Sequence, residues 1–87
     1  QQDMESLVTI FPNPTDGLVH ISSELLKGGA EEIAVINTVG ELVYIVQYPE
    51  VKSGSTELNL ADLPGGVYFI TIRTSHITTT RKISLIR

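Results

Sequence analysis

Short apolar segments alternate with clusters of turn-forming residues along the whole chain. Residues 56–60 alternate strictly between polar and apolar side chains, which predicts a strand with one solvent-facing side. Residues 67–73 are apolar on both faces and give the strongest strand prediction, whereas residues 23–30 predict a loop or a single helical turn. The same pattern predicts further strands at residues 7–11, 18–22, 33–37, 42–47 and 77–86.

Turn signals separate the predicted strands and set their spacing. Pro12, Pro14 and Gly17 predict a stiff loop, because each proline fixes φ and lacks a backbone donor. Gly40 supplies a positive φ to a hairpin turn, and residues 62–66 form another turn cluster. About seven strands at intervals of about 8–12 residues predict an all-β fold, a small antiparallel immunoglobulin-like β-sandwich.

Composition supports this fold class and excludes every kind of site that requires cysteine. The 87 residues suffice for one small domain or for a piece of a larger protein. Ten Ile, eight Val and nine Thr make 27 β-branched residues, which favour a pleated surface over a helix. Because the chain has no Cys, it has no disulfide, no thiolate nucleophile and no cysteine zinc site, and the fold must rest on its apolar core.

Charge divides the chain into an acidic body and a basic end. Residues 1–62 hold all ten acids and two lysines, a net charge of −8, whereas residues 63–87 hold four basic residues and no acid, a net charge of +4. An acidic body argues against nucleic-acid binding, which needs a clustered basic face. The basic residues Arg81, Lys82 and Arg87 either protect the edge of the last strand or form a recognition element.

The residues that carry chemistry do not form a recognisable active site or metal site. His20 lies on the solvent-facing side of a predicted strand and His76 in a turn, and neither belongs to a nucleophile motif. Asp16 lacks the several spaced acids of a calcium loop, so it is interpreted as a residue that closes its turn. We therefore expect a non-enzymatic domain that uses no cofactor and no metal.

Two further classes are disfavoured by the apolar pattern. Tyr44, Tyr68 and Phe69 lie in strongly apolar strands, which predicts core positions rather than a sugar-stacking face. No apolar run approaches the roughly 18 residues of a membrane span, so direct membrane insertion is not expected. No basic-then-apolar leader opens the sequence, so the leader of an exported protein would lie outside these 87 residues.

Four segments of the chain also occur in a recognisable order. They are Phe11-Pro12-Asn13-Pro14 with Gly17 and Ile21, the segment 35–43, the segment 58–70, and Arg81-Lys82-Ile83. In this order and spacing they strongly resemble the C-terminal sorting domain of the type IX (Por) secretion system, type A, over roughly residues 8–87. The positions that carry the resemblance are Pro12, Asn13, Pro14, Gly17, Gly40, Gly66, Tyr68 and Lys82.

The chain departs from the family pattern at two places. Asn37 stands where the family often has Asp, and Asn can cap the same turn without a charge. The chain ends in Arg87, and its nearest Lys is Lys82, so either residue would serve a machinery that reads a basic tail.

The resemblance implies an address label on an exported protein. Such domains follow an N-terminal cargo domain in the same chain, in certain Gram-negative bacteria. The cargo crosses the inner membrane by the general pathway, and the outer-membrane translocon then recognises the folded sorting domain. A sortase-like cysteine peptidase removes the domain at the cell surface and joins the cargo to an anionic lipopolysaccharide. We accordingly expect residues 1–6 to be linker and residues 7–87 the sorting domain, with cleavage in the linker or upstream.

Physical arguments suggest how such a signal is read. As a sheet edge, residues 77–86 would pair with a partner strand or permit dimerisation, and their positive charge would steer encounter with an acidic receptor. The plainer interpretation is that the motif prolines, glycines and Tyr68 only build turns and packing. The competing class is an immunoglobulin-like carbohydrate-binding or adhesin accessory module, which should show a row of exposed aromatic residues or a calcium cage.

Overall fold

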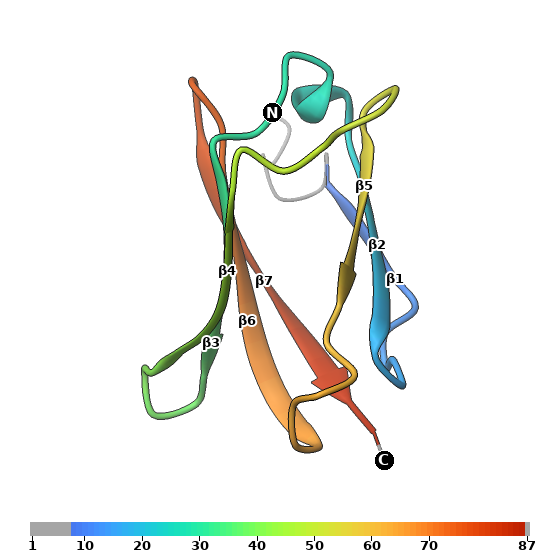
Figure 1. The fold of residues 1–87 in the computed structure, drawn as a ribbon, viewed down its shortest axis with the longest axis vertical. Helices are drawn as coiled ribbons and strands as arrows, with labels where there is room; N and C mark the ends of the chain where they lie inside the picture. The colour runs from blue at the N-terminus through green and yellow to red at the C-terminus, as the bar shows by residue number, and fades with distance from the viewer. Residues whose placement is uncertain (1–7, 87) are drawn as a thin grey trace, which may run out of the picture.

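Within residues 8–86, which the computed structural model describes, the chain forms seven strands and one short 3-10 turn, Glu24–Leu26. All seven strands lie where the sequence predicts them, with boundaries that differ by one or two residues. Leu7, the predicted start of the first strand, lies outside the described residues, as does the predicted linker 1–6. The strands are β1 Thr9–Phe11, β2 Leu18–Ser22, β3 Glu32–Asn37, β4 Leu42–Gln47, β5 Ser55–Asn59, β6 Gly66–Arg73 and β7 Thr78–Leu85 (Figure 1).

The strands form two antiparallel sheets that face each other. One sheet has three strands in the order β1-β2-β5, and the other has four in the order β4-β3-β6-β7. Figure 1 shows the four-stranded sheet on the left and the three-stranded sheet on the right, with the lower end of β7 approaching the right-hand sheet. The prediction of an all-β, two-layer antiparallel sandwich with about seven strands is confirmed.

Strand alternation fills the space between the sheets with aliphatic side chains. Successive residues of a strand point to opposite faces, so β2 directs Val19 and Ile21 inward and β6 directs Ile70 and Ile72 inward. Each buried Val, Leu or Ile contributes roughly 1.5–3 kcal/mol by leaving water. The fully buried members of this core are Ile21, Leu26, Ile33, Leu58, Leu60, Ile70, Ile72, Ile83, Val19 and Val35.

The three aromatic residues predicted as core occupy different environments. Tyr68 is buried, and Tyr44 is half-buried and packs against the core from β4. Phe69 is half-buried on the outer face of the four-stranded sheet, since both its chain neighbours, Tyr68 and Ile70, point inward. The prediction for Phe69 was therefore wrong, because a strand that is apolar on both faces does not reveal which face is covered.

Candidate functional site

The loop after β1 reaches across the molecule to the free edge of β7. The side-chain amide of Asn13 donates to the Lys82 carbonyl at 3.2 Å, and its oxygen accepts the Ser84 N–H at 3.0 Å. Both β7 groups point away from β6, so the amide occupies the place of a neighbouring strand. The first and last segments of the family resemblance are therefore in direct contact. The two bonds join residues that are 69 and 71 positions apart along the chain.

Pro12 and Pro14 flank this amide and are exposed to solvent. The Phe11–Pro12 and Asn13–Pro14 peptide bonds are both cis. Each pyrrolidine ring fixes its own φ, so the backbone has few alternatives on either side of Asn13. We name the exposed surface formed by Pro12, Asn13, Pro14 and Lys82 the proline-loop patch.

Thr15 extends the same contact to the end of β7. Its N–H donates to the Ser84 carbonyl at 2.9 Å, and its carbonyl accepts the Ile86 N–H at 2.8 Å. Its hydroxyl donates to the Leu18 carbonyl and accepts the Gly17 N–H, and the residue is 1% exposed. Sequence reasoning missed Thr15, although its hydroxyl stands beside Asp and Gly in a turn cluster, where such side chains commonly bond the local backbone.

Gly17 joins this loop to the third motif segment. A Cβ at Gly17 would lie 3.0 Å from the Ala61 Cα, and its φ of +149° is one that other residues rarely adopt. The Gly17 carbonyl also accepts the Leu60 N–H at 2.7 Å. Only a residue without a side chain lets the two segments approach this closely.

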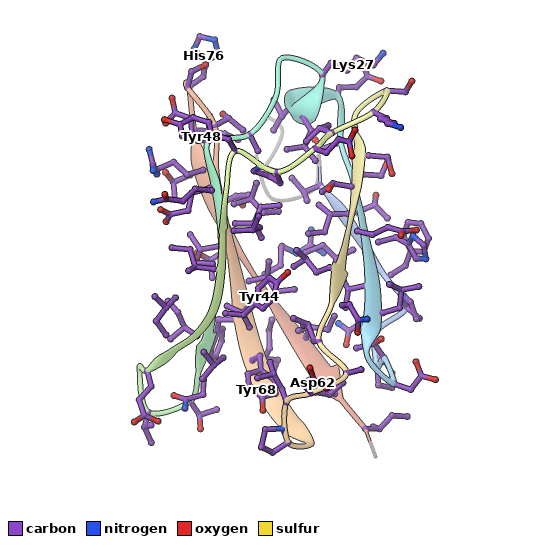
Figure 2. All side chains as sticks on the ribbon, viewed as in Figure 1. Lys27, Tyr44, Tyr48, Asp62, Tyr68 and His76 are labelled. Carbon is purple, nitrogen blue, oxygen red and sulfur yellow. The ribbon has the colours of Figure 1, made fainter. Side chains whose placement is uncertain are left out.

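Tyr68 ties β6 to the turn that precedes it. Its hydroxyl donates to the Pro64 carbonyl at 2.5 Å, and the residue is 5% exposed (Figure 2). This bond to the backbone four residues upstream resembles the tyrosine corner of immunoglobulin-type sandwiches. Gly66 begins β6 directly before this corner, with no atom within 4 Å of the position of a Cβ. Tyr68 therefore holds the turn and offers no surface for contact.

Asn37 caps the hairpin between β3 and β4. Its side-chain oxygen accepts the N–H groups of Val39 at 3.1 Å and Glu41 at 2.9 Å, and its amide donates to the Glu41 carboxylate at 2.8 Å. These bonds confirm the expectation that Asn37 caps this turn in the way that Asp would. Gly40 lies in the same turn. In Figure 1 this β3–β4 turn lies at the lower left and the loop between β1 and β2 lies at the lower right. The structure does not bring these two motif positions together.

The basic residues at the end of the chain have different surroundings. Lys82 is exposed on the outer face of the four-stranded sheet. Arg81 is half-buried, and its guanidinium donates to the Val8 carbonyl, which joins β7 to the start of the other sheet. Arg87 lies outside the described residues. Two residues of the predicted recognition tail are described, Arg81 and Lys82. Of these two, Lys82 is the one whose charged side chain is exposed to solvent.

The two histidines lie at separate places on the surface. His20 is one-third exposed on β2, pairs with Glu57 of β5 at 3.0 Å, and stacks on Phe11 of β1 with ring centroids 5.2 Å apart. These contacts hold three adjacent strands together next to the proline loop. His76 lies in the exposed turn before β7 (Figure 2). Among residues 8–86, no group of three or more His, Cys, Asp or Glu is placed to hold a metal ion.

A cleft of about 490 Å³ opens on the side of the sandwich between β4 and β5. Tyr44 and Val46 line it from β4, Leu58 lines it from β5, and Glu50 and Lys52 lie at its margin. Figure 2 shows Tyr44 extending from β4 into the space between the sheets. The described aromatic residues that are most exposed, Phe11 and Tyr48, lie beside different sheets and do not form the row that a carbohydrate-binding face needs.

Asn13→Ala is expected to lower the free energy of unfolding by about 1–2 kcal/mol, because it removes two hydrogen bonds and frees two edge groups of β7. Urea denaturation measures this loss. Hydrogen exchange should also become faster at the Ser84 amide, whose acceptor is removed. Asn13→Asp is the matched control, since it keeps that acceptor and loses only the donor to Lys82. Equal Ser84 exchange in all three proteins would contradict the role given to Asn13.

Comparisons with known proteins identify the family of this chain. None of the curated proteins compared matches the chain. In the part of the chain that the structure describes, no helix is long and apolar enough to cross a membrane. A sequence model of the family described as "secretion system C-terminal sorting domain" matches residues 9–86, and this range contains each motif segment whose contacts are given above. The chain therefore belongs to the C-terminal sorting domain family of the type IX secretion system.

Proposed function

We propose that this domain is the folded address by which a type IX system exports the cargo domain preceding it in the same chain. Family membership supports the role of sorting signal, and export to the cell surface or beyond follows from it. The observation that carries the finer proposal is the contact between Asn13 and β7, because it makes one surface from the first and last motif segments.

The motif positions differ in exposure, and two of them, Gly40 and Gly66, are exposed glycines that have no side chain to present to a receptor. Gly17 and Tyr68 are buried and explained by packing and turn geometry. Pro12, Asn13 and Pro14 are exposed and lie beside the exposed Lys82. A receptor reads exposed side chains, so we assign recognition by the outer-membrane translocon to the proline-loop patch. The patch has one positive charge, that of Lys82, in a chain whose net charge is −4. This charge would steer an acidic receptor surface toward the patch.

Removal of the domain belongs to the same proposal. We infer that a sortase-like peptidase cleaves before Val8, within residues 1–6 or upstream, and transfers the cargo to surface lipopolysaccharide. Val8 is buried and its carbonyl is bound by Arg81, so cleavage at Val8 itself would require this contact to open. A peptidase that needs an extended substrate would act on the chain before this contact.

The test is a fusion of residues 1–87 to a periplasmic reporter in a type IX host. We expect the reporter at the cell surface or in the medium, and in the periplasm of a host without a working translocon. Periplasmic retention in the intact host, with the domain folded, would overturn the sorting role. Cleavage is followed in the same fusion by the mass of the exported reporter, which should lack the domain.

A second set of fusions tests the proline-loop patch separately. Lys82→Glu, which reverses the one charge of this patch, is expected to reduce export several-fold. Lys52→Glu is the matched control, because its side chain is 81% exposed and lies near the β4–β5 cleft, away from this patch. Arg81 is left unchanged, since reversing it would also break its contact with Val8. Unchanged export of the Lys82 variant would refute charge recognition at this patch and leave the sorting role intact.

A further inference from the structure

β4 differs from the other edge strands of this sandwich. The edge strand β1 has only three residues, and the edge strand β5 carries Glu57. The edge of β7 carries Lys82 and is covered at its end by Asn13 and Thr15. The sequence of β4, LVYIVQ, contains no charge and no proline. Sheet edges usually carry such features because an open edge pairs readily with another strand.

The backbone of β4 is oriented for such pairing. The Tyr48 N–H donates to the Glu31 carbonyl of the β3 side, and in an antiparallel ladder every second residue makes bonds to the same neighbour. Val46 and Tyr44 therefore bond toward β3, whereas Gln47 and Ile45 direct their N–H and C=O groups away from the sheet. A register shift leaves Val43 without a partner, so the regular part of this edge is centred on Ile45.

Both faces of β4 also leave apolar surface uncovered. On the outer face, Ile45 is 45% exposed and Leu42 is 55% exposed. On the inner face, Tyr44 and Val46 line the cleft that opens between β4 and β5. A strand laid beside β4 would cover the outer side chains and close this cleft in one step.

We propose that β4 pairs with β4 of a second copy of this chain, antiparallel, about a two-fold axis at Ile45. This register places Ile45 opposite its own copy on the outer face and Tyr44 opposite Val46 on the inner face. The two four-stranded sheets then join into one sheet of eight strands, and the two clefts meet along the axis. Such an interface is isologous, because each copy contributes the same surface.

The absence of charge on β4 favours a second copy of this chain as the occupant. A symmetric pair brings each side chain near residues of the same strand, so one Lys or Glu near its centre would oppose an equal charge. β4 has no charge at any of its six positions, whereas self-pairing of β5 would bring Glu57 near its copy. This dimer does not depend on the sorting role, and it leaves the proline-loop patch at the other edge of the sheet accessible.

Disulfide trapping tests the register directly. The chain has no Cys, so one introduced Cys forms disulfides only between molecules. Ile45→Cys is expected to give a covalent dimer under mild oxidation, since hydrogen-bonded pairs place Cα atoms about 5.5 Å apart, within disulfide range. Thr80→Cys is the matched control on the exposed edge of β7 in the same sheet. Faster dimer formation by the Thr80 variant would overturn the proposal in favour of β7.

Charge variants of Ile45 test the same interface without oxidation. In sedimentation velocity from micromolar to millimolar concentration, the unchanged 87-residue chain should approach the mass of a dimer. Ile45→Lys and Ile45→Glu should each remain monomeric, and an equal mixture of the two should recover the dimer. Circular dichroism checks that each variant is folded, as expected for a half-exposed position. A monomeric parent chain, or a dimer that persists in the Lys variant, would refute the proposal.

Discussion

Replacing Gly54 by Ala is expected to lower the free energy of unfolding by about 2–4 kcal/mol, the sum of backbone strain and overpacking. The φ of Gly54 is +77°, and a Cβ there would lie 2.7 Å from the Ser23 carbonyl oxygen. Neither backbone can move freely, because the Ser23 N–H donates to the Gly54 carbonyl at 2.9 Å. The two loops would have to separate and lose this bond.

Urea denaturation of Gly54→Ala against Gly40→Ala separates the two contributions. Gly40 has a similar φ of +88°, but no atom lies within 4 Å of its Cβ position. The Gly40 variant should therefore lose only about 1 kcal/mol, the cost of placing Ala in the left-handed region. Equal losses in the two variants would mean that the contact with Ser23 is absent in solution.

Ile70→Ala is expected to lower the free energy of unfolding by about 2–5 kcal/mol, because it leaves a cavity in the middle of the core. Ile70 is 0% exposed and lies on β6, between β3 and β7. No disulfide compensates for the loss, since the chain has no Cys. For a domain of this size, the loss is a large share of a total of about 5–15 kcal/mol.

The same substitution tests whether the export signal is the folded domain. Export of a reporter fused to Ile70→Ala should fall as the temperature approaches the lowered melting point. Ile86→Ala is the matched control, because that side chain is 54% exposed and only its backbone N–H bonds to Thr15. Export that stays constant through thermal unfolding of the Ile70 variant would show that a linear peptide is the signal.

Features that depend on neighbouring residues could be predicted from the sequence. The alternation of residues 56–60 gives the position of β5, whose side chains are exposed and buried in turn. The role of Asn37 is equally local, since the backbone groups that it caps belong to Val39 and Glu41. Short-range rules of periodicity and turn chemistry therefore located the strands and one of the caps.

Features that join distant segments could not be predicted in this way. The family resemblance named Asn13, but nothing near it in sequence indicates that its amide bonds to β7. The sequence offers Arg81 either as protection of the strand edge or as part of a recognition element, and it gives no sign of the contact with Val8, which spans 73 residues. Nothing near Gly54 in sequence indicates its close approach to Ser23, which belongs to another segment. The sequence also does not show that Asn13 and Thr15 cover the end of β7, while β4 at the opposite edge of the sheet has no such cover among the described residues.

The bond between Asn13 and β7 also determines when the proposed recognition surface comes into existence. Closing a loop of about 70 residues costs conformational entropy, so this contact depends on the other native contacts that bring β7 and the proline loop together. Before those contacts form, Asn13 and Lys82 belong to separate parts of the chain. A receptor that binds Asn13 and Lys82 at once would therefore bind only folded domains. Recognition by such a receptor would exclude from export any cargo whose sorting domain is unfolded.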